Sequence, residues 1–378
     1  MKKLILLLFI IITTFLLQAC GKSITNPDDT FCIAGKNEGI YICEKKYTSF
    51  FDTIISLKIY YDESSDYEVN KIFEDFENLS EKYHQYFDKY NAYDNLNNLY
   101  TINNTDGPVV VDEELFDAIL YAKENEDLVT IDSTSLFNIA LHPVLMVWHN
   151  ARNSSACDPF INIGVDYCPV PTSEIEGHTF NTNPNDIILD KTNHSIDFKK
   201  EDMGIDLGGF AKGYFNEIAI EYLNTYNINY ILNLGNSNVH AHGVNLDRTD
   251  GLFYIGLSTP FSLNPNDYYA IVKLSNGLNL VSSGNYQRYF KNVDDLEDET
   301  LYHHIIDPRT YYPGGEATSI TILYNNGAIG DILSTTLYLM TVEEGLEYVN
   351  NFPGLEALWY IDEDNIVMSE NFKDYIME

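Results

Sequence analysis

Asp331, Ser334 and Thr335 stand at positions i, i+3 and i+4 of a helical segment, so their side chains should share one helix face. One exposed carboxylate and two hydroxyls are hard oxygen ligands. Magnesium takes few such ligands from a protein, because it keeps several waters and completes its shell with phosphate oxygens. The same residues are also typical of a helix start at which Asp331 stabilises the helix dipole. Taken alone, this second interpretation is favoured.

A glycine-containing segment that leads into a helix could hold a phosphate. Residues 205–214 read Ile-Asp-Leu-Gly-Gly-Phe-Ala-Lys-Gly-Tyr. Glycines let a ligand approach the backbone, and a helix N-terminus presents unpaired N–H groups to an anion. Lys212 would add a positive charge on the first turn, close to the carboxylate of Asp206. For a generic Gly-Gly pair, an ordinary turn before a surface helix is the commoner interpretation.

A histidine in a polar segment could transfer a proton. Residues 302–310 read Tyr-His-His-Ile-Ile-Asp-Pro-Arg-Thr. His304 is a candidate general acid or base, because the ordinary pKa of histidine lies close to neutral pH. A paired surface histidine fits the same spacing equally well.

The elements that must position these residues follow no regular β-α-β order. Helices are expected at 69–87, after Asp112, after Gly209 and, as one long final helix, at about 330–342. Strands are expected at 53–61, 187–190, 195–198, 230–234, 252–257, 270–274 and 319–323. The order predicts an α+β fold with mixed, largely antiparallel sheets and packed helices, in a single large two-lobed domain.

The N-terminus predicts export and a lipid anchor. Two lysines precede an apolar run from Leu4 to Leu17, which has the length of a signal-peptide core and is short for a membrane span. The run ends in Leu-Gln-Ala-Cys-Gly, which resembles the lipobox of bacterial lipoproteins, where Cys20 would be lipidated. An ordinary signal peptide that happens to precede a cysteine is the alternative. We predict a signal peptide at 1–19, a tether at 20–45 and the main domain at 46–378, anchored by palmitate-type lipid at the extracytoplasmic face of the cell membrane.

The charge balance limits the partners. There are 57 acidic against 22 basic residues, and the net charge of −35 argues against nucleic-acid binding. An anionic substrate would need a divalent cation or well-placed donors to offset this repulsion.

Cys32 with Cys43, and Cys157 with Cys168, are separated by the same interval. In an oxidising compartment this spacing predicts two local disulfides, with free thiols as the alternative and a metal site less favoured.

Five motifs occur in a fixed order along the chain. They are the lipobox, Asp-Leu-Gly-Gly-Phe-Ala-Lys-Gly-Tyr, Ser-Gly-Asn-Tyr-x-Arg, His-His-Ile-Ile-Asp-Pro-Arg-Thr and Asp-x-x-Ser-Thr. Together they resemble the ApbE family, the FAD:protein FMN transferases, over roughly residues 46–345. The resemblance implies an ApbE-like, T-fold-like domain. It also implies that FAD is the substrate and that FMN is transferred, with Mg²⁺, to a Thr or Ser hydroxyl of a partner flavoprotein, releasing AMP.

The resemblance implies roles for individual residues as well. His304 would be the acid/base residue, with Asp331 beside it in the catalytic machinery. Tyr90 would stack on the flavin ring, or Tyr93 if the local insertion is aligned differently. Magnesium would be held by Asp331, Ser334, Thr335 and the backbone carbonyl of Gly209. The other residues that line the FAD site would be Phe51, Phe137, Asn138, Ile139, Asp206, Lys212 and Ile306.

The chain departs from the family pattern at four places. Asn236 replaces the second glycine of a Gly-Gly pair, and Tyr311-Tyr312 replaces a glycine that usually follows Arg-Thr. Asn138 and His142 replace the usual Asp and Gly near the flavin. None of these positions is a metal ligand, so they bear on FAD affinity and rate rather than on the type of reaction.

Three other functions remain open. A magnesium-dependent FAD pyrophosphatase would use the same site with water as the nucleophile, giving FMN and AMP. A non-catalytic flavin-binding lipoprotein would lack a competent metal site. A solute-binding lipoprotein would be expected to show two lobes with β-α-β patterning, which the sequence does not contain.

Overall fold

The computed structural model describes residues 30–377, apart from 66–67, 132, 163 and 275–276. The predicted signal peptide and Cys20 lie outside these residues. Among the described residues, no helix combines the length and hydropathy that a membrane crossing needs.

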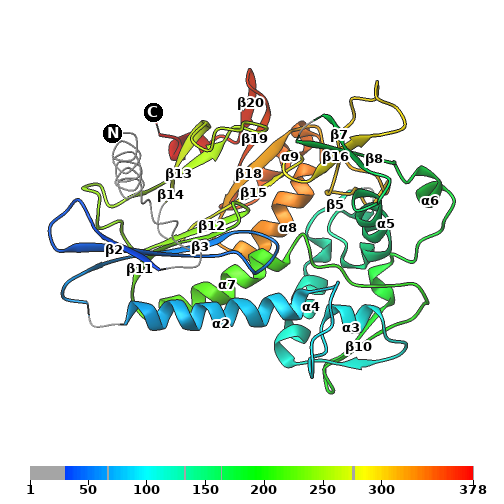
Figure 1. The fold of residues 1–378 in the computed structure, drawn as a ribbon, viewed down its shortest axis with the longest axis horizontal. Helices are drawn as coiled ribbons and strands as arrows, with labels where there is room; N and C mark the ends of the chain where they lie inside the picture. The colour runs from blue at the N-terminus through cyan, green and yellow to red at the C-terminus, as the bar shows by residue number, and fades with distance from the viewer. Residues whose placement is uncertain (1–29, 66–67, 132, 163, 275–276, 378) are drawn as a thin grey trace, which may run out of the picture.

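A nine-stranded antiparallel sheet forms the centre of the molecule (Figure 1). Each strand pairs antiparallel with its neighbours, in the order β1-β2-β3-β11-β12-β15-β18-β19-β20. The strands are β1 (Phe31–Ala34), β2 (Ile40–Tyr47), β3 (Ile55–Asp62), β11 (Asn229–Leu234), β12 (Asn238–His242), β15 (Asn279–Gly284), β18 (Ser319–Tyr324), β19 (Glu356–Asp362) and β20 (Asn365–Met368).

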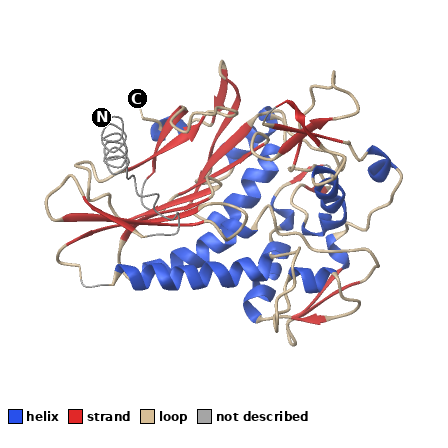
Figure 2. Cartoon of the chain, in the orientation of Figure 1, coloured by secondary structure: helices blue, strands red, loops and turns tan. Residues whose placement is uncertain are grey.

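Helices cover one face of this sheet (Figure 2). They are α2 (Val69–Phe87), α7 (Ala211–Asn224) and α8 (Gly327–Tyr338), followed by α9 (Val342–Asn351). The opposite face is covered by the hairpin of β13 (Phe253–Ser258) and β14 (Tyr268–Leu274) and by the short helix η4 (Phe372–Tyr375). Because side chains alternate along a strand, Leu232 packs with the helices while Ile231 packs with the hairpin layer.

Smaller elements surround the end of the sheet at which the helices α7 and α8 meet. A four-stranded sheet has the order β17-β16-β8-β7, in which β16 and β8 are parallel. Its strands are β7 (Asp158–Asn162), β8 (Val165–Cys168), β16 (Tyr289–Asn292) and β17 (Tyr302–His303). The remaining elements are α3 (Leu99–Asn103), β4 (Val109–Val110), α4 (Glu113–Glu124), η1 (Glu126–Leu128), β5 (Thr130–Ile131), β6 (Thr134–Ser135), η2 (Ile139–Leu141), α5 (His142–Arg152), α6 (Thr172–Glu176), η3 (Pro184–Asp186), β9 (Ile187–Asp190) and β10 (Ser195–Phe198). The predicted α+β class, with mixed and largely antiparallel sheets, is confirmed.

The predicted tether at 20–45 is wrong for its described part. Residues 31–34 and 40–47 form β1 and β2, and β2 pairs with β3 along its whole length. Cys43 and Tyr47 are buried in the sheet, with 0% and 2% of their surface exposed. The glycine and polar residues between the two strands form the turn of the hairpin. Successive side chains of β2 point to opposite faces of the sheet, which brings Cys43 and Tyr47 into the core.

The single helix predicted at 330–342 is also wrong, because two helices occupy this region. Helix α8 ends at Tyr338, and the carbonyl of Leu339 accepts a hydrogen bond from the Arg309 guanidinium at 2.9 Å. The next helix begins with a capping box, in which Thr341 and Glu344 satisfy each other's backbone N–H groups.

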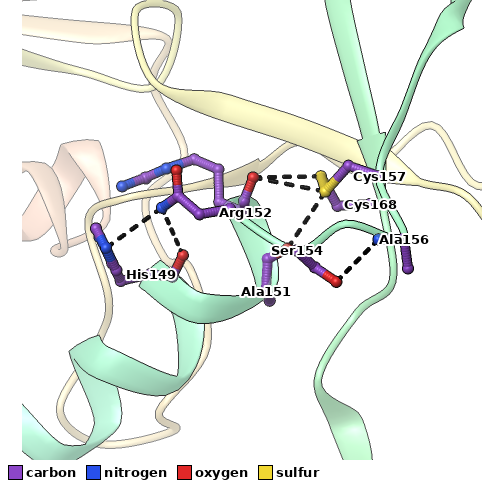
Figure 3. The surroundings of a disulfide bond; sticks show 8 residues. His149, Ala151, Arg152, Ser154, Ala156, Cys157 and Cys168 are labelled. Carbon is purple, nitrogen blue, oxygen red and sulfur yellow. Dashed lines mark hydrogen bonds between the residues drawn. A yellow bond between two sulfur atoms is a disulfide. The ribbon is translucent and has the colours of Figure 1, made fainter.

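Both predicted disulfides are present. Cys32 and Cys43 are directly opposite each other in the β1–β2 hairpin. Cys157 and Cys168 join the start of the β7 segment to the end of β8, immediately after α5 (Figure 3). Each closes a short loop and restricts the unfolded chain.

Two buried histidines make the stability of the fold sensitive to acid. Burial lowers the pKa of His240 and of His303 from 6.5 to about 4. The unfolded chain therefore binds more protons than the folded one between these values, so the free energy of unfolding should fall as the pH drops from 7 to 4. The expected loss is about 1.4 kcal/mol per pH unit for each histidine below pH 6.5.

Urea denaturation at several pH values measures this effect. A His240→Gln variant keeps a polar side chain but cannot titrate, so its curve of unfolding free energy against pH should be shallower than that of the parent. Identical slopes in the two proteins would contradict the assignment of His240 as a neutral buried group.

Candidate active site

A deep cleft opens at the end of the central sheet where β3 begins and where β11 and β15 end. It measures about 1600 Å³ including the solvent in its mouth. The walls come from α5, the segment before β3, the start of α7, the β11–β12 turn and the middle of α8, which Figure 1 shows converging from distant parts of the chain. Clefts of this kind are the usual place for a small-molecule site.

Most residues predicted for the site line this cleft, and two do not. The lining residues are Phe51, Tyr90, Phe137, Asn138, Asp206, Gly209, Lys212, His304, Ile306, Asp331 and Thr335. Ile139 lies fully buried behind the wall, where its carbonyl accepts a hydrogen bond from the backbone N–H of Asp206. Ser334 is also fully buried. The structure thus brings most of the predicted residues to one cleft, whereas Ile139 and Ser334 are buried behind its wall and do not line it.

Asp206 is held as a charged carboxylate. Its oxygens accept hydrogen bonds from the Lys89 ammonium and, at 2.7 Å, from the backbone N–H of Gly208. Burial pushes the pKa of Asp206 upward, but the charge and hydrogen bond of Lys89 outweigh it and keep the pKa below its ordinary value. The sequence did not indicate this ion pair, because the two residues are far apart in the chain.

Asp331 lies in a different environment. Its side chain is 4% exposed, so the expectation of an exposed carboxylate is wrong. The oxygens accept hydrogen bonds from the Gly213 backbone N–H at 2.6 Å and from the Asn238 side chain at 2.7 Å. Burial raises the pKa of Asp331, and the nearby charge of Lys212 opposes this only in part. A buried carboxylate without an ion-pair partner is stabilised as an anion when a cation binds beside it.

The cleft presents part of a hard-oxygen ligand set around this carboxylate. The Thr335 hydroxyl lies on the same wall and so close to Gly209 that a methyl group added at this glycine would lie 3.5 Å from the hydroxyl oxygen. Ser334 instead faces β15, where its hydroxyl lies 2.8 Å from that of Ser283. Asp331, Thr335 and the backbone of Gly209 therefore fit a magnesium ion that keeps several waters. Within the described ranges there is no cluster of three or more His, Cys, Asp or Glu side chains that could hold a metal ion.

The segment after α2 presents Tyr90 to the cleft. The Asp88 carboxylate accepts hydrogen bonds from the backbone N–H groups of Tyr90 and Asn91 and from the hydroxyl of Tyr93. Tyr90 therefore lines the cleft, whereas the hydroxyl of Tyr93 is bound to the Asp88 carboxylate within the turn. Tyr90 stacks on His149, with ring centroids 4.6 Å apart and planes inclined by 25°.

His304 is arranged to accept a proton. Its Nδ1 lies 3.3 Å from the backbone carbonyl of Arg288. A carbonyl only accepts, so Nδ1 donates in this contact and Nε2 keeps its lone pair. Partial desolvation in the cleft lowers the pKa of His304 below 6.5, and the charge of Arg288 lowers it further. The imidazole is therefore neutral at pH 7.

Two departures from the family pattern have a clear place in the structure. Gly235 and Asn236 both have positive φ, 66° and 59°, and form the tight turn between β11 and β12. Asn tolerates this left-handed conformation, so it serves here where glycine is usual. Tyr311 has φ of 64°, and its carbonyl accepts a hydrogen bond from the Trp148 indole at 2.8 Å. Glycine adopts such backbone without strain, which explains its use at this position.

Other lining residues were missed by sequence reasoning. They are Lys89, His149, Arg152 and Arg288, of which only Arg288 lies in one of the five motifs, Ser-Gly-Asn-Tyr-x-Arg. The helical spacing of Trp148, His149 and Arg152 was visible, but nothing in the sequence indicated which face of α5 meets the cleft.

Comparison with known proteins identifies relatives of this chain. The model of the ApbE family matches residues 51–359. A Klebsiella pneumoniae protein named FAD:protein FMN transferase is 31% identical over 267 residues, covering 69% of this chain and 73% of that protein. A Treponema pallidum protein of the same name is 24% identical over 190 residues, covering 48% and 51%.

Solved structures show the same fold. The ApbE protein of Thermotoga maritima superposes with a TM-score of 0.71 and 25% identity, covering 89% of this chain and 99% of that one. The flavin transferase ApbE of Vibrio cholerae superposes with a TM-score of 0.68 and 18% identity, covering 92% and 100%.

Proposed function

This chain belongs to the ApbE family, and we propose that it transfers FMN from FAD to a Thr or Ser hydroxyl of a partner flavoprotein, with Mg²⁺, releasing AMP. The observation that supports this most directly is the joint placement of His304, Asp331 and Thr335 in one cleft. A proton acceptor and a cation-binding carboxylate in the same cleft are what attack on a phosphorus atom requires.

The residues would divide the reaction between them. The acceptor oxygen forms a bond to the FMN-side phosphorus, the bond from that phosphorus to the AMP oxygen breaks, and the hydroxyl proton passes to Nε2 of His304. Asp331, Thr335 and the carbonyl of Gly209 would hold Mg²⁺, which supplies charge stabilisation of the pyrophosphate and of the leaving group. Tyr90 would orient the flavin ring by stacking.

A mass measurement tests the proposal. The full-length protein in detergent is incubated with FAD, Mg²⁺ and a flavoprotein acceptor, and the acceptor is weighed by mass spectrometry. A mass gain equal to FMN, dependent on both FAD and Mg²⁺, is expected. Free FMN release at an equal rate with and without acceptor, and no mass gain, would show a pyrophosphatase instead.

Tyr90→Ala should weaken FAD binding by about 1–3 kcal/mol, because an aromatic platform under a conjugated ring contributes on this scale. Tyr90 is 40% exposed within the cleft, whereas Tyr93 does not line it. Fluorescence titration with FAD measures the effect, and Tyr93→Ala is the matched control. A large loss in Tyr93→Ala with none in Tyr90→Ala would move the stacking role to Tyr93.

We further propose that the protein is exported and anchored by lipid at Cys20, on the extracytoplasmic face of the membrane. The Leu-Gln-Ala-Cys string after an apolar run supports this, as does the pair of disulfides, which are typical of oxidising compartments. Labelling with a radioactive fatty acid should mark the parent and leave Cys20→Ser unmarked.

A further inference from the structure

The charge of the cleft is opposite to that of the chain. Four basic side chains line it, Lys89, Arg152, Lys212 and Arg288, against the carboxylates of Asp206 and Asp331. The whole chain carries a net charge of −35. Lys89 is paired with Asp206, and Lys212 acts on Asp331, so among the described lining residues the two arginines are the basic groups left without compensation.

The two arginines lie apart from acidic side chains. In the part of the chain that the structure describes, neither guanidinium is within ion-pair distance of a carboxylate. Arg288 donates a hydrogen bond to the carbonyl of Asp52 at 3.1 Å, which fixes its direction without neutralising it. Burial and the charge of Arg288 both lower the pKa of Arg152. Holding two like charges in one cleft costs free energy unless an anion binds between them.

Both arginines belong to segments that contact the strand β8. The carbonyl of Arg152, the last residue of α5, lies 3.5 Å from the sulfur of Cys157 and 3.6 Å from that of Cys168. Figure 3 shows the side chains of His149 and Arg152 extending away from this disulfide to the same side. Arg288 directly precedes β16, which pairs in parallel with β8 at Cys168. The Cys157–Cys168 bond therefore ties the end of α5 to the strand that also supports Arg288.

We propose that Arg152 and Arg288 form an anion subsite, held in place by the Cys157–Cys168 disulfide, that binds the pyrophosphate of FAD. This inference rests on the proposed function for the identity of the ligand. Guanidinium groups bind phosphate and carboxylate oxygens through paired hydrogen bonds, so an acidic side chain of the acceptor offers the same chemistry from a second source. The pyrophosphate is favoured for two reasons. Its two negative charges match the two arginines, and the residue predicted to stack on the flavin, Tyr90, lines the same cleft as the arginines.

The first test replaces Arg152 and measures binding without turnover. FAD and riboflavin are titrated by fluorescence into the parent, Arg152→Gln and Arg152→Lys in the absence of acceptor. Arg152→Gln should weaken FAD binding roughly tenfold to hundredfold, the usual effect of losing a charged hydrogen bond, while riboflavin binding stays unchanged. Arg152→Lys should recover part of the loss, and inorganic pyrophosphate should displace FAD less well from Arg152→Gln than from the parent.

The matched control is Arg248→Gln. It removes the same charge from an arginine that is paired with Asp250 and does not line the cleft. It should leave FAD binding at the parental value, and an equal loss in both variants would overturn the proposal in favour of a general charge effect.

The remaining outcomes separate the two sources of the anion. Unchanged FAD binding in Arg152→Gln together with a raised KM for the acceptor protein would support the subsite and assign it to an acceptor carboxylate. No change in either quantity would overturn it. Binding is measured without transfer, so a parent that binds FAD through Arg152 yet labels no acceptor would refute the proposed function and leave the subsite standing.

The second test addresses the disulfide. The double variant Cys157→Ser/Cys168→Ser should weaken FAD binding at least about threefold by releasing the end of α5. Cys32→Ser/Cys43→Ser removes a disulfide with the same spacing whose residues do not line the cleft, and should leave FAD binding unchanged. Near-ultraviolet circular dichroism confirms that both variants are folded. Parental FAD affinity in the folded Cys157→Ser/Cys168→Ser variant would overturn the positioning role of the disulfide.

Discussion

Asp331→Asn is expected to lower magnesium-dependent turnover of FAD by at least about 100-fold, because the cation would lose the one carboxylate among its proposed ligands. Asp331, Thr335 and the backbone of Gly209 line the same cleft, and only the first of these is charged. The amide is close in size to the carboxylate but has no negative charge to offer the cation.

The surroundings of Asp331 suggest that this variant will fold. Asn238 donates to the carboxylate through its Nδ2, and its own Oδ1 is buried without a partner among the described residues. If the side-chain amide of Asn238 turns over, its Oδ1 can accept from the new amide nitrogen, so the contact is kept with roles reversed. Thermal unfolding should therefore remain cooperative. The measurement is AMP release against magnesium concentration, and a parental rate at saturating Mg²⁺ would remove Asp331 from the metal site.

His304→Ala is expected to lower FMN transfer by about 10²–10⁴, the usual effect of removing a general base. The imidazole is neutral, its Nδ1 is engaged by the Arg288 carbonyl and the residue lines the cleft, so Nε2 is the nitrogen that can take the hydroxyl proton of the acceptor. FAD and magnesium affinity should change little, because Ile306 is the one predicted ligand that lies in the same segment as His304 and the substitution leaves it in place. Hydrolysis of FAD should fall less than transfer, since a metal-bound water already has a lowered pKa and needs less help from a base.

Two rates measured on the same samples decide this prediction. Acceptor labelling is followed by mass spectrometry and free FMN by chromatography, in the parent and in His304→Ala. A variant that labels its acceptor at the parental rate would show that His304 does not act as the base. His303→Gln is an unsuitable control, because His303 is buried and its Nδ1 accepts the Ile305 backbone N–H.

Local patterns predicted the elements that are amphipathic along their whole length. Helix α2 has the predicted bounds, and β9, β10 and β18 lie where alternation placed them. The break after Tyr338 was not predicted, although the capping box of Thr341 and Glu344 that begins the next helix is a local sequence pattern. The contact of Arg309 with the carbonyl of Leu339 comes from another segment and was not visible in the sequence. The β1–β2 hairpin was missed because a short strand on the edge of a sheet looks like a polar tether until its partner is known.

In the site too, local motifs predicted which residues take part, but not the contacts that they make with distant segments. Motifs selected Asp206, His304 and Asp331, and these residues do line one cleft. Their electrostatic states were not predictable, because they depend on partners such as Lys89 and Asn238 that only the fold brings near. Helical spacing alone also placed Ser334 with Thr335, whereas packing turns Ser334 toward β15.

The order of strands in the central sheet also controls when the site can exist. Strand β3 pairs with β11 in a register that joins Ile55 to Leu234, and the cleft also needs α8 near the end of the chain. Such long-range pairing is slow, because the entropy of closing large loops must be overcome before contacts repay it. A chain still emerging from a ribosome therefore lacks a complete cleft until α8 has been synthesised. Binding of FAD therefore has to wait until nearly the whole chain has been synthesised and folded, so the topology delays formation of the site rather than its chemistry.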